Sequence, residues 1–376
     1  MTVCQGKRIF IDATGASIGG GYTYLVNVIS RICKQAPEAQ FRLMLRHEGL
    51  ATAVAPEANL QIDALPSVNV LKRLKHVYLD LPGIVKDWNA DLYFSVGEVS
   101  PYTTHCPAIA SFRNPSVFLP ILLQPTNYER ARVALLSVAA KISAKRCKKV
   151  MFASDDSSQW IGDSLNMPIE KRATIHHGID AEMWAAAPPF ADHPRPYILT
   201  VGSIYPYKNF VRLIKAWTIL TEENPDVPDL IIIGDKHDIE HQNQMEEARR
   251  AAGDLGSRVH LLGGIPYTTI QSYYAGAKLF VFPSYTETFG HPLLEAMAAG
   301  IPLVATDMPV FREIAEDAAL YADAHDIADI ARALKSALDP ETASALIRKG
   351  NAQMKLFSWD RTATRLLALF ESTMKP

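Results

Sequence analysis

Short apolar segments alternate with longer segments of helical periodicity along the whole chain. In the first half, strands are expected at residues 8–12, 41–45, 91–95, 108–112 and 150–153; in the second half they are expected at 197–201, 229–233, 258–262, 278–282 and 302–305. Strands that alternate with helices are typical of a mostly parallel sheet with helices on both faces. The pattern predicts an α/β protein of two Rossmann-like, doubly wound halves that face each other across a cleft.

A proline-rich segment separates the two halves. Pro188, Pro189, Pro194 and Pro196 follow one another closely, and such a segment continues neither a helix nor a central strand. We interpret it as an interdomain linker, with an N-terminal domain at 1–185 and a C-terminal domain at 196–358. The amphipathic pattern at 359–376 predicts a final helix that packs back on the N-terminal domain.

Length and composition agree with two folded domains. The 376 residues exceed the roughly 250–300 at which one hydrophobic core stops growing, and 48% of them are apolar. The chain has no uncharged apolar run of 18 residues and no secretory leader pattern, so we expect neither a membrane span nor export. Cys4, Cys33, Cys106 and Cys147 are far apart, which argues against a zinc site or a disulfide framework and favours a cytoplasmic location.

The net charge of −2 conceals an asymmetry between the halves. Residues 1–185 carry 20 Lys and Arg against 16 Asp and Glu, which leaves the remainder at −6. Basic residues are dense at 130–149, interleaved with apolar ones at roughly helical spacing. Such a helix either lies on the cytoplasmic face of an anionic membrane or faces an anionic ligand; the alternative is the solvated face of a packed helix.

The segment 278–300 carries the most chemical information. An apolar strand and a loop precede a helix that begins near His291 and ends at Gly300, and this helix is apolar on nearly every side except at Glu295. A buried carboxylate needs a partner, and the two hydroxyls of a nucleotide ribose are suitable donors. The amides of Phe289, Gly290 and His291 are expected to hold a diphosphate at the helix N-terminus. A structural salt bridge from Glu295 to Lys or Arg is the alternative.

Two further loops offer groups for an anionic ligand. Lys208 follows the first strand of the second half, and Asn209 is placed to cap the next helix, so a cation is expected beside another helix N-terminus. Gly20 and Gly21 lie in a glycine-rich loop after the first strand. They do not complete a nicotinamide fingerprint, because Tyr24 stands where its third glycine belongs. A surface lysine and a plain tight turn are the alternatives.

Taken together, these motifs resemble glycosyltransferase family 4, retaining enzymes of the GT-B fold. Glu287 and Glu295 have seven residues between them inside Glu-Thr-Phe-Gly-His-Pro-Leu-Leu-Glu-Ala-Met-Ala-Ala-Gly. The resemblance extends over nearly the whole chain, through Val201-Gly202-Ser203, Lys208-Asn209, His177-Gly178-Ile179-Asp180, the glycine loop and Phe357-Ser358-Trp359.

The resemblance implies roles for individual residues. Glu295 would bind the donor ribose, Glu287 would lie near the transferred sugar, and Lys208 would bind the diphosphate beside Gly202. Arg113 would stand, with Asn114, where many relatives have a histidine. Ser203 departs from the family, because many relatives have a second cationic residue, an arginine, at this position. The glycine loop at Gly20 and Gly21 would help to hold donor phosphates and acceptor.

The implied reaction is retaining transfer of a hexose from a nucleotide diphosphate sugar, with neither metal nor cofactor. No Asp-x-Asp motif stands in the second half of the sequence to hold magnesium or manganese. Mannose from GDP-mannose, passed to a glycan or polyprenyl-linked saccharide of a surface polysaccharide, is the specific expectation, and no nucleic-acid partner is expected. A nucleotide-sugar epimerase, a nicotinamide oxidoreductase and a non-catalytic sugar-nucleotide binding protein are the alternatives.

Overall fold

The computed structural model describes residues 3–15, 20–46, 51–65, 70–101, 104–120, 126–190, 192–235 and 238–375. It divides the chain into two compact units, unit 1 (Met1–Gly178 and Ser358–Pro376) and unit 2 (Ile179–Phe357). The proline-rich segment therefore belongs to unit 2 and does not separate the units. Phe190 ties it there, because its amide donates to the carbonyl of Ser272 at 2.8 Å and its ring stacks on Tyr273 at 4.1 Å.

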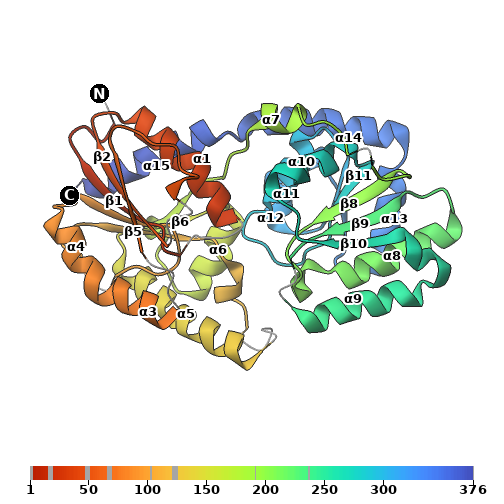
Figure 1. The fold of residues 1–376 in the computed structure, drawn as a ribbon, viewed down its shortest axis with the longest axis horizontal. Coiled ribbons are helices and arrows are strands. Elements are labelled where there is room, and N and C mark those ends of the chain that lie inside the picture. The colour runs from red at the N-terminus through yellow and green to blue at the C-terminus, as the bar shows by residue number, and fades with distance from the viewer. Residues whose placement is uncertain are drawn as a thin grey trace. The chain divides into compact units, whose positions relative to one another are not determined.

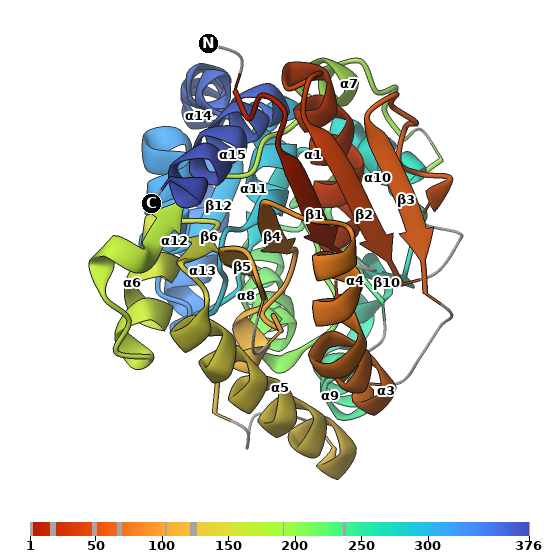
Figure 2. The same ribbon diagram turned by 90° about the vertical axis from the view of Figure 1, so that its left-hand side faces the viewer.

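In unit 1, the described strands form one parallel sheet in the order β3-β2-β1-β4-β5-β6-β7, part of which faces the viewer in Figure 2. The strands are β1 (Arg8–Asp12), β2 (Gln40–Leu45), β3 (Leu60–Ala64), β4 (Leu92–Ser95), β5 (Ala108–Phe112), β6 (Lys149–Phe152) and β7 (Arg172–Thr174). The central strands β4 and β5 are buried along their whole length, as expected for a sheet covered on both faces.

Helices cover both faces of this sheet. They are α1 (Gly20–Gln35), α3 (Val70–Lys75), α4 (Leu81–Asp87), α5 (Asn127–Arg146), α6 (Asp155–Ser164) and α15 (Trp359–Met374), with a π-helical turn at His76–Asp80 and 3-10 turns at Pro115–Val117 and Ile169–Lys171. Ile9 and Ile11 of β1 pack in one core with α1 and α15, whereas Phe10 packs in another with α4 and α5. This division follows from the alternation of side chains along a strand.

The predicted return of the C-terminal helix is confirmed, because α15 is part of unit 1. Leu366 and Phe370 are buried in the same core as α1, and the Phe370 ring lies 5.2 Å from that of Phe94 in β4. Thr362 donates to the carbonyl of His176 at 2.8 Å. Gly178 passes so close to the start of α15 that a Cβ atom there would lie 2.1 Å from the amide nitrogen of Trp359.

Unit 2 contains the second parallel sheet, in the order β10-β9-β8-β11-β12-β13 among the described strands (Figure 1). The strands are β8 (Tyr197–Val201), β9 (Asp229–Ile233), β10 (Val259–Gly263), β11 (Leu279–Phe282), β12 (Leu303–Thr306) and β13 (Leu320–Ala322). Five of them lie within a residue of the predicted positions.

The helices of unit 2 are α7 (Ala181–Ala185), α8 (Phe210–Glu223), α9 (Ile239–Ala251), α10 (Tyr267–Gly276), α11 (His291–Ala298), α12 (Pro309–Ala315), α13 (Ile327–Ala337) and α14 (Pro340–Gln353). Its 3-10 turns are Pro206–Lys208, Gly253–Arg258, Glu316–Ala318 and Met354–Leu356. Trp217 of α8 and Leu334 of α13 are fully buried against strands of this sheet, so unit 2 has a core of its own.

Candidate functional site

The strand order of unit 2 reverses between β8 and β11, and the predicted site lies at the carboxyl ends of these two strands. Successive strands run from β8 to β10 on one side and from β11 to β13 on the other. Open α/β sheets bind ligands at such a reversal. Lys208 follows β8 and Glu287 follows β11, and Lys208 Nζ lies 2.5 Å from Glu287 Oε1. Their side chains are only 12% and 13% exposed, so the pair is largely shielded from water.

The side chain of Lys208 is held by its neighbours. Its stem lies over Gly202, where an added Cβ would come within 3.4 Å of Lys208 Cδ and Cε. The ammonium nitrogen lies 5.1 Å from the ring centroid of Phe282 and 5.6 Å from that of Tyr207. Burial, reinforced by the charge of Glu287, raises the pKa of Tyr207, which therefore stays protonated. Ser203 follows Gly202 and brings no charge.

Glu295 is buried within α11, as predicted, but its recorded partners are tyrosine hydroxyls and a histidine. Tyr274 donates to Oε2 at 2.8 Å, Tyr267 donates to Oε1 at 3.4 Å, and His291 Nδ1 lies 3.3 Å from Oε1. Burial, followed by the charge of Glu295, raises the pKa of Tyr274 well above its ordinary value. The alternative of a Lys or Arg salt bridge finds no support among the described residues, and Oε1 has only long contacts.

The loop before α11 turns sharply at Gly290. Gly290 has φ of +84°, a conformation that favours glycine, and a Cβ there would lie 2.9 Å from the Phe311 ring. Both the backbone conformation and the lack of space therefore disfavour a larger residue. Phe289 is buried and its ring packs edge-on against Phe357 at 6.3 Å. The helix then begins at His291 and closes at Gly300, whose φ of +69° is that of a left-handed terminator.

The expectation that Asn209 caps α8 with its side chain is wrong. Asn209 stands at the N-cap position with φ of +63°, but its side chain makes no cap hydrogen bond to the helix amides. Its Nδ2 donates to the carbonyl of Ala324 at 2.7 Å, and its Oδ1 accepts from Arg212 Nη1 at 2.9 Å. Sequence reasoning missed Arg212, a cation in the first turn of α8 whose charge also acts on Tyr285.

In unit 1, Arg113 follows β5, close to the reversal of strand order between β1 and β4. Its Nη2 donates to the carbonyl of Val96 at 3.2 Å, and its guanidinium lies 4.4 Å from the ring centroid of Tyr24. Burial lowers the pKa of Arg113, while Tyr24 and Glu98 act in the opposite direction. The backbone amides of Arg113 and Asn114 both donate to Glu98 Oε1, at 3.0 and 2.8 Å. Glu98 therefore fixes the loop that presents Arg113.

The glycines of the first half are placed differently from the prediction. Gly20 and Gly21 begin α1 and are not part of a loop, while Gly19 lies outside the described residues. His177 packs between aromatic rings, 5.3 Å from that of Tyr24 and 6.0 Å from that of Trp359. This placement is that of a packing residue.

The basic stretch at 130–149 is only partly helical, since α5 ends at Arg146 and β6 begins at Lys149. Leu135 and Val138 are exposed on α5, whereas Val133 and Leu136 are buried. The exposed side of α5 is therefore apolar in its middle and continues into basic residues, Lys141 and Lys145. In the part of the chain that the structure describes, no helix is long and apolar enough to cross a membrane.

One group of potential metal ligands was not anticipated from the sequence. His193, Asp229 and His260 are distant in sequence but cluster in unit 2, at the amino ends of its strands. They lie at the amino ends of the strands, whereas Lys208 and Glu287 lie at the carboxyl ends. The cluster therefore does not test the expectation that the donor site at the carboxyl ends works without a metal, which remains a prediction.

Comparison with known proteins identifies the class of enzyme. Residues 186–353 match the family model described as glycosyl transferases group 1. The O-antigen chain mannosyltransferase B of Escherichia coli is 26% identical over 276 residues, covering 70% of each chain. The O-antigen chain mannosyltransferase RfbU of Salmonella typhimurium is 29% identical over 189 residues, so the match spans half of that relative's length and half of this chain.

The fold is also that of a solved structure. Sucrose-phosphate synthase from Thermosynechococcus elongatus superimposes with a TM-score of 0.75 at 18% identity, and the match covers 97% of this chain and 98% of that one. This likeness confirms the predicted GT-B class, with two Rossmann-like α/β halves. The chain is a glycosyltransferase, and its residues 186–353 are similar to the group 1 glycosyltransferases.

Proposed function

We propose that this glycosyltransferase moves mannose from GDP-mannose, with retention and without a metal, to a glycan or polyprenyl-linked saccharide in surface polysaccharide synthesis. The observation that carries the proposed donor site is the Lys208–Glu287 pair at the strand reversal of unit 2. The choice of mannose rests on relatives that are named O-antigen mannosyltransferases.

The leaving group in this reaction is a nucleoside diphosphate, whose negative charge grows as the glycosidic bond breaks. Lys208 is held where it can meet that charge, because it lies in the loop that follows β8 and its ammonium pairs with Glu287, in the loop between β11 and α11. The N-terminus of α11, with the amides of Phe289, Gly290 and His291, adds a partial positive charge. Electrostatic stabilisation of the diphosphate is the main catalytic contribution that these residues offer.

Glu295 is suited to bind a ribose because only one of its two carboxylate oxygens accepts a short hydrogen bond within the protein. Oε2 takes the short bond from Tyr274, whereas Oε1 has contacts of 3.3 and 3.4 Å only. A ribose hydroxyl would donate to Oε1, and Tyr274 would keep the carboxylate in place. Glu287 would orient the sugar and stabilise positive charge at its anomeric carbon.

Arg212 would supply the cation that is missing at Ser203. Asn209 Oδ1 accepts from Arg212 Nη1, which positions the guanidinium in the first turn of α8, two residues after the first residue of the helix, Phe210. Bidentate hydrogen bonding makes arginine well suited to phosphate oxygens. On this proposal Arg212→Gln weakens nucleotide binding, whereas Arg332→Gln, which removes a surface cation paired with Asp329, does not.

Asp235 supports guanine as the base. It follows β9, its backbone carbonyl accepts from the amide of Ile204 near Lys208, and its side chain is exposed. A Cβ at Gly264 would overlap Asp235 Oδ1 at 1.8 Å, so this glycine leaves room for the carboxylate. Two carboxylate oxygens match the N1–H and N2–H donors of guanine, whereas uracil offers one such donor.

The exposed side of α5 supports contact with an anionic membrane, where polyprenyl-linked acceptors are found. Leu135 and Val138 would enter the lipid headgroup region, and Lys141 and Lys145 would meet lipid phosphates. Lys148 and Lys149 are less suited, since their ammonium groups already donate to the carbonyls of Lys375 and Glu170.

A thermal-shift screen against guanosine, uridine, thymidine and adenosine diphosphates tests the donor proposal. A ligand at about 100 times its dissociation constant adds about 2.7 kcal/mol of stability. Selective stabilisation by GDP is the expected result, and Asp235→Asn is expected to reduce it. A response to UDP alone would contradict the assignment of the base, and mannose transfer from GDP-mannose then decides the sugar.

A further inference from the structure

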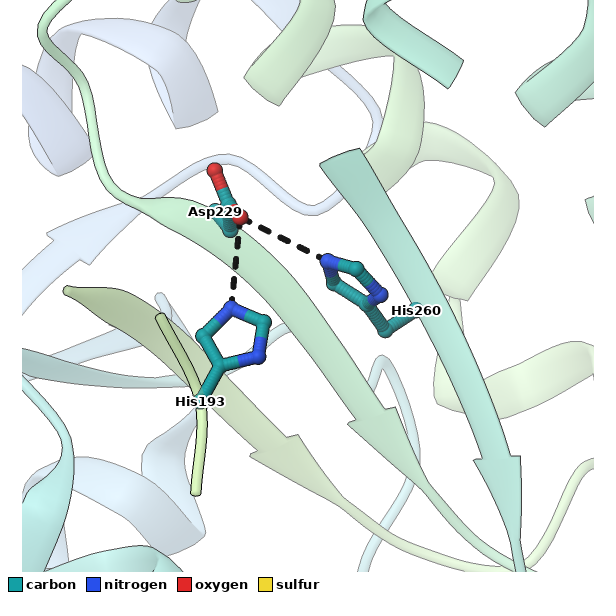
Figure 3. Close-up of side chains that lie close together, drawn as sticks. All are labelled: His193, Asp229 and His260. Atoms are coloured by element: carbon teal, nitrogen blue, oxygen red, sulfur yellow. Dashed lines mark hydrogen bonds and ion pairs between the residues drawn. The ribbon is translucent and has the colours of Figure 1, made fainter. Parts of the chain in front are cut away.

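The amino ends of the strands in unit 2 carry a group of side chains that the proposed sugar transfer does not use. Asp229 is the first residue of β9, His260 lies on the neighbouring strand β10, and His193 precedes β8 on the other side (Figure 3). Their side chains are 5%, 31% and 11% exposed, respectively. Two neighbouring strands and the segment before a third thus bring two imidazoles to one buried carboxylate.

Both histidines direct the same kind of atom at the same oxygen. His193 Nε2 lies 3.2 Å from Asp229 Oδ2, and His260 Nε2 lies 3.5 Å from it, as the dashed lines in Figure 3 mark. The three ligand atoms all lie within 4.8 Å of one another. The second distance is long for a hydrogen bond.

These distances fit ligands around a common ion. Zinc binds histidine nitrogen and carboxylate oxygen at about 2.0–2.1 Å in tetrahedral sites, which separates neighbouring ligand atoms by about 3.3–3.4 Å. The two measured separations fall on either side of that value. We propose that His193, Asp229 and His260 form a binding site for a zinc-class divalent cation, with water as the fourth ligand on the exposed side of His260.

The remaining oxygen of Asp229 is occupied by two arginines. Arg258 Nε lies 2.8 Å and Arg195 Nε 3.0 Å from Oδ1, which leaves Oδ2 to the histidines. This arrangement fixes the carboxylate, as groups behind a metal ligand commonly do. The two positive charges also oppose a cation, so the site is weaker than a zinc site without them.

The bound ion would fasten the proline-rich segment to the sheet. His193 lies in that segment, whereas Asp229 and His260 belong to the sheet itself. An ion that binds the folded unit and not the unfolded chain stabilises it by mass action. The site is therefore structural, and its loss leaves the donor site at the other end of the strands intact.

The test uses the full chain after treatment with a chelator and gel filtration. Zinc chloride is titrated by calorimetry at pH 7.5, Co²⁺ is added in parallel as a spectroscopic probe, and the melting temperature is recorded with and without metal. We expect one zinc per chain, a visible absorption band of tetrahedral Co²⁺ and a rise in melting temperature. His260→Gln should weaken zinc binding at least tenfold and remove the rise.

Two further variants make the result specific. His325→Gln removes an exposed histidine of the same unit and should leave zinc binding unchanged. Arg195→Gln removes a cation from Asp229 and should tighten zinc binding several-fold, an effect that zinc bound elsewhere would not show. Circular dichroism checks that each variant is folded, and His193→Gln replaces His260→Gln if the latter is not.

An ion-pair clamp without metal is the competing explanation. It predicts no stoichiometric zinc binding, or zinc binding that neither His260→Gln nor Arg195→Gln alters. Either result overturns the proposal.

Discussion

Replacing Glu287 by glutamine should tighten the binding of the free nucleoside diphosphate while slowing sugar transfer. In the ligand-free protein Glu287 Oε1 lies 2.5 Å from Lys208 Nζ. A diphosphate that binds Lys208 must compete with this carboxylate. Glutamine keeps the shape of the side chain but removes the competing charge. Less free energy is then needed to release the Lys208 ammonium for the diphosphate.

The size of the effect follows from the hydrogen bond that is weakened. A hydrogen bond to a charged group contributes about 1.5–3 kcal/mol and one between neutral groups about 0.5–1.5 kcal/mol. Both side chains are nearly nine-tenths buried, so solvent screening is limited. A difference of about 1–2 kcal/mol corresponds to GDP binding that is roughly 5–30-fold tighter. The turnover number should fall, because Glu287 is assigned to the charge that develops at the sugar.

Isothermal titration of GDP into the wild-type protein and the Glu287→Gln variant measures the first effect, and steady-state kinetics measures the second. Glu246→Gln is the matched control, since Glu246 is paired with Arg249 on the surface of α9. Unchanged or weaker GDP binding by a folded Glu287→Gln variant would refute the idea that the carboxylate competes for Lys208.

Three further predictions address the other parts of the site. Glu295→Gln should raise the donor KM about ten- to hundredfold with a smaller effect on kcat, because the ribose bond is present equally in ground and transition states; an unaltered KM in steady-state assays would contradict this role. Transfer should continue in EDTA, since Lys208 and helix amides meet the diphosphate; complete loss that manganese restores would argue for a catalytic metal. Leu135→Ser with Val138→Ser should reduce sedimentation with anionic vesicles more than with neutral ones, and equal sedimentation of mutant and wild type would leave the exposed side of α5 without a membrane role.

The central strands could be predicted because they are continuous apolar runs. Strands β8 and β9 lie at the predicted residues, and each is buried over nearly its whole length. The edge strands β3, β7 and β13 were not predicted. All three are partly exposed, and β7 and β13 have only three residues each, so they lack the apolar run that marks a central strand.

Sequence spacing located the groups of the candidate site but not their partners. The burial of Glu295 and the terminating Gly300 followed from the helical pattern. Tyr274 could not be assigned to Glu295, because it belongs to a different helix and the contact depends on how α10 and α11 pack. The side chain of Asn209 was misassigned for a related reason, since its bond to Ala324 joins residues far apart in sequence and outcompetes a local cap.

The cluster of His193, Asp229 and His260 shows the same limit more strongly. Metal motifs are recognised in sequence when their ligands recur at short intervals. Here each ligand comes from a different strand or segment, so only the order of strands in the sheet reveals that they meet.

The position of α15 has a consequence for the order in which the two units fold during synthesis. Domains generally fold as units, the N-terminal one first during synthesis. Unit 1 instead needs Leu366 and Phe370 from the last described helix to complete its core. The ribosome must therefore translate all of unit 2 before unit 1 can complete its core. Until then, nascent unit 1 exposes the apolar side of α1. Unit 2, whose residues are contiguous, is the part that can finish folding first.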